Sequence, residues 1–276
     1  MQFAPSTYYA AKARPPSARD LSDARLGREI QRIHDENYGV YGVRKVWRQI
    51  LRDGEQVGRD QVGRIMAARG LEGVRRGKAK RTTTPADLSL RPADLVDRKF
   101  FATAPNRLWL ADITYVWTWS GFCYTSFITD AFARRIVGWR VSKSLRTDLA
   151  LDALEMAICT RNGEDLSELI HHSDRGVQYL AIRYTERLAD EAAVASVGSK
   201  GDSFDNALAE TVNGLYKTEL IHRRGPWKTM EQLELATGAW VSWWNERRLH
   251  EARDYVPPAE YEESYYRRLG EASSAA

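Results

Sequence analysis

The chain has 276 residues, of which 43% are hydrophobic and 28% are charged. This composition is that of an ordinary globular protein, and the length predicts a main domain with one or two accessory domains. A membrane protein is excluded, because no apolar run approaches the ~18 residues that a membrane span requires. The first residues lack the pattern of a signal peptide. Cys123 and Cys159 lie in apolar segments, which predicts buried thiols in a reducing cytoplasm.

The net charge of +4 conceals an uneven distribution along the chain. Residues 1–100 contain 21 Lys and Arg against 12 Asp and Glu, whereas the remainder contains 20 against 25. A basic N-terminal part predicts a polyanionic partner, most simply nucleic acid. A solvated basic surface without such a partner would explain the charge equally well.

The N-terminal part predicts a small helical domain. Residues 1–19 contain three prolines and little periodicity, which indicates an extended leader. Residues 20–74 contain three apolar runs at helical spacing, separated by Gly-containing turns. Short helices with tight turns predict a helix-turn-helix-like DNA-binding domain, with Arg59 and Arg64 near the start of its third helix. A plain three-helix bundle is the alternative interpretation.

A polar segment follows, and we predict that residues 75–102 form a linker. Its composition has no apolar periodicity, and basic residues gather near its start. Such a segment could lie along DNA phosphates. The candidate contacts are Lys78, Lys80 and Arg81.

The pattern then changes to that of an α/β domain, with predicted bounds 103–222. Strands are predicted at 108–118, 122–130, 135–141, 169–170 and 194–197, and helices at 148–160 and 181–191. Three antiparallel strands followed by alternating helices and strands predict a mixed sheet flanked by helices. Residues 223–276 are predicted to form a helical extension, in which the segment Trp240–Trp244 packs against the core rather than stacking on bases.

Three carboxylates in this region are candidates for chemistry. Asp112 lies in the middle of a predicted strand, where burial of an unpaired carboxylate is costly; an edge strand facing water is the alternative. Asp174 follows a strand, where Asp is also common as a turn or helix cap. Glu210 lies on a predicted helix, in a polar stripe with Asn206, Asn213 and Lys217, which alone would be typical of an exposed face. Taken together and in order, the three carry more weight than each does alone.

These segments resemble the retroviral-integrase superfamily, and closely the second reading frame of two-frame bacterial insertion sequences. The resemblance rests on Trp109–Tyr115, His172–Tyr179 and Asp205–Ala207 with Glu210 and Lys217. It extends over nearly the whole chain, including Tyr41–Arg44 and Trp243–Asn245. It implies a ribonuclease-H-like fold and a transposase.

The resemblance also implies roles for individual residues. Asp112, Asp174 and Glu210 would hold two Mg²⁺ ions, for which Mn²⁺ would substitute, and would catalyse cleavage at the element's ends and transfer of the 3′-OH to target DNA. Lys217 would hold a phosphate nearby. His172 and Asn206 would support the carboxylates. Arg44 joins Arg59 and Arg64 as a candidate DNA contact in the helical domain.

The resemblance further implies partners. Double-stranded DNA would be bound both as terminal inverted repeats and as target, by a homo-oligomer associated with the bacterial nucleoid. Because the upstream helix-turn-helix and heptad-rich segment of such elements is not found here, end recognition is predicted to need the upstream reading-frame product or a frameshift fusion with it.

Several other interpretations are weighed against this one. A zinc site at His171 and His172 lacks cysteine ligands at suitable spacing. A hydrolase triad at Ser173 lacks a base and an orienting partner. A non-catalytic DNA-binding regulator and a ribonuclease-H-type nuclease are the alternatives. The intact carboxylate trio disfavours the first, and the basic helical N-terminal part together with Lys217 disfavours the second.

Overall fold

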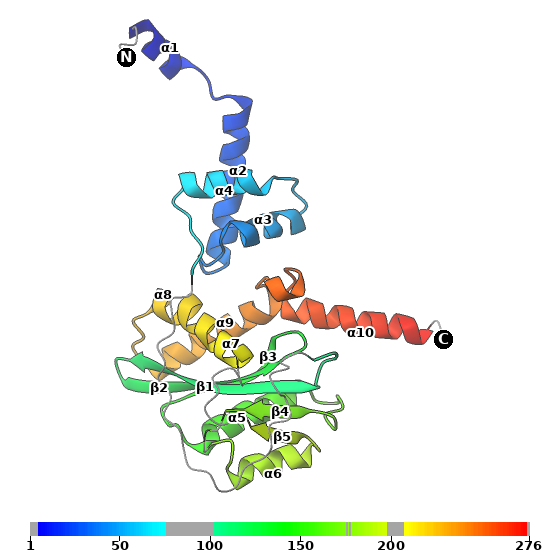
Figure 1. Ribbon diagram of the computed structural model, residues 1–276. Coiled ribbons are helices and arrows are strands. Elements are labelled where there is room, and N and C mark those ends of the chain that lie inside the picture. The colour runs from blue at the N-terminus through cyan, green and yellow to red at the C-terminus, as the bar shows by residue number, and fades with distance from the viewer. Residues whose placement is uncertain (1–4, 76–101, 175, 177, 198–206, 275–276) are drawn as a thin grey trace. The chain divides into compact units, whose positions relative to one another are not determined.

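The computed structural model describes residues 5–75, 102–174, 176, 178–197 and 207–274. The chain divides into two compact units, Met1–Val74 and Arg75–Ala276. Figure 1 shows the first unit as helices alone and the second as a sheet with helices on both sides.

The described residues of the first unit form four helices, one more than predicted. They are α1 (Pro5–Ala13), α2 (Ala18–Glu36), α3 (Val43–Arg52) and α4 (Arg59–Ala68). The prediction of an extended leader was wrong, because Pro5 occupies the first position of α1, where its missing N–H costs nothing. The Ser17 hydroxyl accepts from the backbone N–H of Asp20, and the Asp20 carboxylate accepts in return from that of Ser17, which starts α2.

Helices α2, α3 and α4 enclose the small core that their apolar spacing predicts. The fully buried side chains are those of Ile30, Val46, Ile50 and Val62. The predicted turns lie where the helices end. This packing fits both of the predicted interpretations, the helix-turn-helix-like domain and the three-helix bundle.

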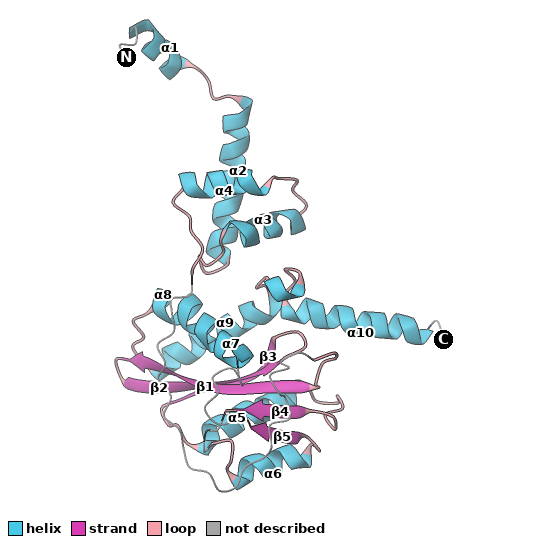
Figure 2. Ribbon diagram, viewed as in Figure 1, coloured by secondary structure: helices cyan, strands magenta, loops and turns pink. Residues whose placement is uncertain are grey.

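The second unit is built on a five-stranded mixed sheet (Figure 2). Its strands are β1 (Leu108–Thr118), β2 (Gly121–Asp130), β3 (Arg135–Ser142), β4 (Ile170–Ser173) and β5 (Val194–Val197). Their order is β3-β2-β1-β4-β5. The first three strands are antiparallel to one another, whereas β4 pairs in parallel with β1, and β5 in parallel with β4.

Helices cover both faces of this sheet. The helices α5 (Thr147–Thr160) and α6 (Ile182–Asp190) lie on one face, and α7 (Ala207–Tyr216), α9 (Met230–Glu246) and α10 (Pro258–Ser274) on the other (Figure 1). Strand β3 and α5 approach so closely that a Cβ on Gly138 would lie 2.1 Å from the Ala153 carbonyl oxygen. The predicted mixed sheet with flanking helices is confirmed, and its order and strand directions are those of a ribonuclease-H-like fold.

The C-terminal helices belong to this core. Trp240 and Trp244 on α9 are almost completely buried, so the expectation that this helix packs is confirmed. Between α7 and α9 lie η1 (Lys217–Ile221), a π-helical turn, and α8 (His222–Arg224). A 3₁₀ turn, η2 (Glu251–Arg253), precedes α10.

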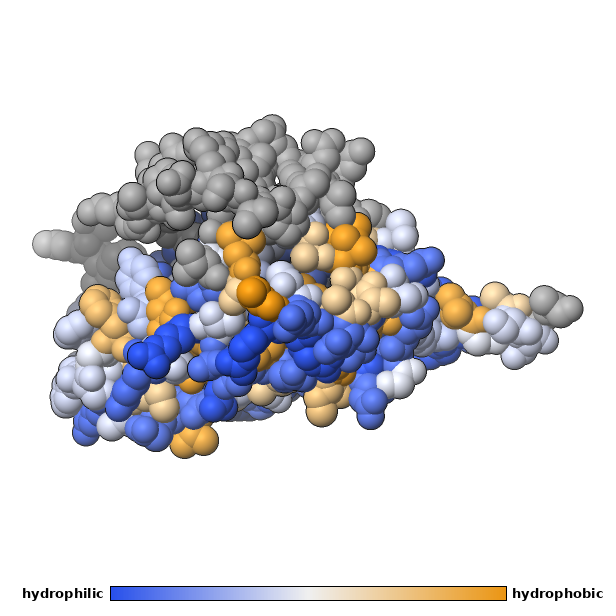
Figure 3. Space-filling model, turned by 90° about the horizontal axis from the view of Figure 1, so that it is seen from below, coloured by the Kyte–Doolittle hydropathy of each residue, from blue (hydrophilic) through white to orange (hydrophobic). Residues whose placement is uncertain are grey.

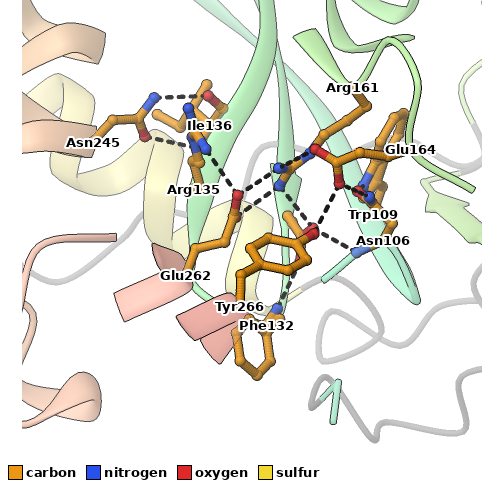
Figure 4. A network of polar contacts seen from close by, with 11 residues as sticks. Asn106, Trp109, Phe132, Arg135, Ile136, Arg161, Glu164, Asn245, Glu262 and Tyr266 are labelled. Atoms are coloured by element: carbon orange, nitrogen blue, oxygen red, sulfur yellow. Dashed lines mark hydrogen bonds and ion pairs between the residues drawn. The ribbon is translucent and has the colours of Figure 1, made fainter. Parts of the chain in front are cut away.

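A buried ionic network attaches α10 to the sheet (Figure 4). The Arg161 guanidinium donates to both carboxylate oxygens of Glu262, at 2.5 and 2.8 Å, and to Asp130 at 3.2 Å. Arg135 donates to Glu262 at 2.8 Å. Burial alone would raise the pKa of Glu262, but the hydrogen bonds and charges of the two arginines lower it overall. The network therefore holds Glu262 ionised inside the protein.

Two further predictions concern cysteines and membranes. Cys123 is buried as predicted, but Cys159 is exposed, because it lies on the outer side of α5 near its end. Among the described residues, no helix is both long and apolar enough to cross a membrane. In the space-filling view, hydrophilic residues cover much of the visible face and apolar residues form separate patches (Figure 3).

Candidate active site

Strand pairing places Asp112 and Asp174 next to each other. Ser173, the last residue of β4, is paired with Ala111 of β1. Each of these two residues is followed by an aspartate. Asp112 continues β1, and Asp174 comes directly after the end of β4. Asp112 is thus in a central strand and half-buried, and the alternative of an edge strand facing water is wrong.

The surroundings of Asp112 favour its protonated form. Burial raises the pKa of this carboxyl to about 7, and the charge of Asp174 adds to the increase. Hydrogen bonds from the side chain of Asn213 (2.8 Å) and the backbone N–H of Ile113 (2.9 Å) oppose it. The charge of Glu210 raises the pKa further. A carboxyl that resists ionisation while two others approach it is typical of a functional site.

Helix α7 crosses β1 at this point and contributes a second polar group. Asn213 lies one turn after Glu210, so the two side chains share a face of the helix. Asn213 is buried and its Oδ1 atom has no hydrogen-bond partner among the described residues. Glu210 is exposed, at the start of the helix. Glu210 and Asn213, the described members of the predicted polar stripe on α7, therefore lie on the side of the helix that faces Asp112.

Asp174 is supported from its own loop and from β4. Its Oδ1 accepts from the backbone N–H of Gly176 at 2.9 Å. Loss of hydration raises the pKa of Asp174, while that hydrogen bond and the charge of His172 lower it. His172 itself is completely buried, with Nδ1 3.0 Å from the Ser196 hydroxyl on β5. His172 lies close enough to Asp174 for its charge to act on that carboxyl.

Lys217 lies at the margin of the carboxylates. Its Nζ is 4.3 Å from the centroid of the Tyr115 ring on β1. Burial lowers the pKa of Lys217, and the charge of Asp112 opposes that change. The ammonium group therefore lies over the Tyr115 ring and close enough to Asp112 for the two charges to interact.

The carboxylates are neighbours without forming a closed metal site. Within the described part of the chain, no three His, Cys, Asp or Glu side chains lie close enough together to hold a metal ion. The two histidines of β4 have other partners, since His171 Nε2 lies 3.0 Å from the Tyr184 hydroxyl.

Comparison with known proteins assigns both units. Residues 102–203 and 194–258 match integrase core domains, and residues 21–79 match an HTH-like domain. A "Putative transposase for insertion sequence element IS986/IS6110" of Mycobacterium tuberculosis (strain ATCC 25177 / H37Ra) is 55% identical over 269 residues, 96% of this chain and 97% of the relative. The transposase for insertion sequence element IS629 of Shigella sonnei is 50% identical over 100% of this chain and 93% of its own length.

The chain belongs to the insertion-sequence transposases. It is a DDE-type polynucleotidyl transferase, an enzyme whose class is named after two aspartates and a glutamate. Among solved structures, the transposase is similar to the HTLV-2 integrase catalytic core domain in complex with magnesium, with a TM-score of 0.46 and 15% identity, over 58% of this chain and 98% of that one. The catalytic core domain of BIV integrase has a TM-score of 0.44 and 19% identity, over 59% and 99%.

The predicted DNA contacts of the transposase lie apart from the carboxylates along the chain. Arg44 is exposed on α3. Arg59 is exposed and lies 3.2 Å from Asp60, and Arg64 forms an ion pair of 2.8 Å with Asp23. Four other predicted site residues lie outside the described residues: Lys78, Lys80, Arg81 and Asn206.

Two residues of the site were not assigned a role from the sequence. Asn213 was seen only as part of the polar stripe, although its spacing of three from Glu210 was a usable signal. Tyr115 belongs to the strand predicted at 108–118, and nothing in the sequence indicates that Lys217 lies over its ring.

Proposed function

We propose that this transposase cleaves DNA at the ends of its insertion sequence and transfers the freed 3′-OH to target DNA, with Asp112, Asp174 and Glu210 as the catalytic carboxylates. One observation carries the proposal: the charges of Asp174 and Glu210 both raise the pKa of Asp112. Neighbouring carboxylates repel one another, and a bound cation would remove that repulsion.

The residues fit a hard divalent cation. Carboxylate oxygens are the ligands that Mg²⁺ prefers, and Mn²⁺ accepts the same set. When bound, two such ions would activate the attacking oxygen and stabilise charge on the leaving oxygen. In this proposal Asp112 and Asp174 provide the preformed part of the site. Glu210, one helical turn from Asn213, would approach when the cations bind.

The chain's other residues would position these ligands and the DNA. Asn213 and Ile113 hold the Asp112 carboxyl through their hydrogen bonds, and Gly176 holds that of Asp174. Lys217 would bind a DNA phosphate beside Asp112, because it is a cation within the electrostatic reach of that carboxyl. His172 would support Asp174 from the adjoining strand.

The proposal includes partners and location. The HTH-like domain of the N-terminal unit would bind the terminal inverted repeats, with Arg44, Arg59 and Arg64 as candidate contacts and the predicted linker lying along phosphates. A homo-oligomer would bring two ends together on target DNA, at the nucleoid in the cytoplasm. The upstream reading-frame product, free or fused, would complete end recognition.

Joining of labelled oligonucleotide duplexes carrying the element's end tests the proposal. Asp112→Asn, Asp174→Asn and Glu210→Gln are each expected to reduce joining by orders of magnitude with Mg²⁺ and with Mn²⁺, because each removes a ligand. DNA binding in gel shifts should remain. The matched control is Asp190→Asn, which changes an exposed aspartate at the end of α6 and should join at the parent rate.

Two outcomes would contradict the proposal. If Asp112→Asn joins DNA at the rate of the parent, Asp112 is not a catalytic residue. Cleavage by the parent without any joining, in the presence of the upstream product, would favour the alternative of a nuclease.

A further inference from the structure

An exposed group of aromatic side chains lies at the far end of the β1–β2 hairpin. Tyr115 and Trp117 on β1, Trp119 in the turn and Phe122 on β2 are 47%, 62%, 66% and 49% exposed. We call these four residues the aromatic platform. Large aromatic side chains gain most from burial, so four of them open to water on one hairpin indicate a surface that is covered in function.

The platform is ordered by its own contacts. Trp117 and Phe122 are cross-strand partners, and their rings meet edge to face at 4.7 Å. Tyr115 meets Phe122 in the same manner at 5.9 Å. The backbone N–H of Trp119 donates to the Trp227 carbonyl at 2.9 Å, which holds the turn against the segment after α8. The rings are thus held in place before any partner arrives.

Basic side chains accompany the rings. Lys217 Nζ is 4.3 Å from the Tyr115 ring centroid, and Lys228 Nζ is 5.8 Å from that of Trp119. The exposed residues His222 and Arg223 of α8 come shortly before Trp227. Protein–protein interfaces are enriched in aromatic residues but depleted in Lys, whereas surfaces for single-stranded nucleic acid combine aromatic rings with a positively charged groove. The charge therefore favours nucleic acid as the partner.

The platform lies farther along β1 than Asp112. Tyr115 and Trp117 share the face of Trp109 and Ala111, which pack against α5, whereas Asp112 faces α7, so a DNA strand must pass the edge of β1 beyond the end of β4 to reach both. Tyr115 is three residues beyond Asp112 and Trp117 is five, which at ~3.4 Å per residue places them about 10 and 17 Å along the strand. Stacked nucleotides also advance by about 3.4 Å each. A strand reacting at Asp112 and passing this edge of β1 would reach the rings at least about three to five nucleotides away. Lys217, between Asp112 and Tyr115, would hold the intervening phosphate.

We propose that the aromatic platform stacks on unpaired bases of the DNA strand at least about three to five nucleotides from the reacting phosphate. Bases within a duplex present only their edges, so the strand must be unpaired there for its flat faces to meet the rings. This inference rests on the proposed function, because it takes the reacting phosphate to lie at Asp112. It gives the transposase a means of holding a DNA end that has been opened for cleavage or joining.

The test uses the full chain and two probes, a blunt duplex and the same duplex with a short single-stranded overhang that carries 2-aminopurine. Trp117→Ala and Trp119→Ala are each expected to weaken binding of the overhang probe about tenfold, with little effect on the blunt duplex. Quenching of 2-aminopurine, which reports stacking on indole, should fall in parallel. Trp117→Phe should retain most of both signals, because a π-face remains.

Controls separate this proposal from loss of fold and from failure of the proposed function. Leu235→Ala, which shortens a side chain that is 79% exposed on α9, should bind both probes as the parent does. Melting temperatures of the Trp variants should equal that of the parent. Asp112→Asn should lose joining but keep quenching, so joining by that variant would contradict the proposed function and leave the platform supported.

Three outcomes would overturn the platform. If the Trp variants bind the overhang probe as tightly as the parent does, the platform does not bind DNA. If they lose as much affinity for the blunt duplex as for the overhang probe, the rings do not select unpaired bases. If the Trp variants sediment differently from the parent in the absence of DNA while 2-aminopurine quenching is unchanged, the hairpin is a contact between copies of the chain.

Discussion

Asp112→Asn is expected to stabilise the fold when no divalent cation is present, even though it removes a proposed catalytic residue. Burial and the charge of Asp174 raise the pKa of Asp112 from 3.8 to about 7. At about 1.36 kcal/mol per pH unit, ionising this carboxyl costs the folded protein up to about 4 kcal/mol. Asn has nearly the same shape and carries no charge, so the cost disappears in the variant.

The hydrogen bonds around position 112 can survive the change. The new amide oxygen would accept from the backbone N–H of Ile113, as Asp112 Oδ1 does. The new amide nitrogen would meet the Nδ2 group of Asn213, but rotation of that amide would turn its unpartnered Oδ1 towards the new donor. Repulsion is thus replaced by a neutral hydrogen bond.

The pH dependence has a definite sign. An acid with a raised pKa binds its proton more tightly in the folded than in the unfolded protein, so the stability of the parent falls as pH rises from about 4 to about 7. Asp112→Asn lacks this contribution. Its advantage should therefore grow through that window and be constant above about pH 7.

Thermal unfolding of both proteins in chelator, at about pH 5 and about pH 8, measures the effect. For a unit the size of Arg75–Ala276, each kcal/mol changes the melting temperature by about 2–4 °C. Mg²⁺ should stabilise the parent by mass action and the variant much less. The reasoning would be refuted by a variant that melts below the parent at the higher pH in chelator, or by identical pH dependence in the two.

Three further predictions concern other parts of the molecule. Lys217→Ala should leave the melting temperature unchanged and reduce joining, and Lys217→Arg should retain part of the activity because the charge survives in a different geometry; normal joining by Lys217→Ala would make the residue an ordinary surface lysine. Glu262→Gln should destabilise the core unit by about 3–5 kcal/mol in denaturant unfolding, because the buried Arg161 loses the carboxylate to which it donates two hydrogen bonds and keeps Asp130 and Glu164 at 3.2 and 3.4 Å; a loss below about 1 kcal/mol would show that these two carboxylates compensate Arg161. Binding of the full chain to duplex DNA should weaken steeply between low and moderate salt as counterions return to the phosphates; a flat salt dependence would contradict the electrostatic interpretation.

The sequence alone determined the elements that local patterns encode. Strand β1 begins and ends at the predicted residues because polar and apolar side chains alternate along it, and α3 ends where Asp53 and Gly54 stop the helix. The three prolines of residues 1–19 predict an extended chain, but Pro5 is compatible with a first helical turn and begins α1. Periodicity also fixed the polar stripe of α7, and with it the side of the helix on which Glu210 and Asn213 lie.

The tertiary structure decided which of these residues meet. Asp112 and Asp174 are 62 positions apart in the numbering, and only the parallel pairing of β4 with β1 brings them together. The exposure of Tyr115 and Trp117 could not be read from an alternation that elsewhere on β1 marks buried residues, because it depends on how far the helices extend over the sheet. Likewise, the raised pKa of Asp112 arises from charges and burial supplied by β4 and α7. Local sequence specifies which face of an element is apolar, whereas only the packing of distant segments determines what that face meets.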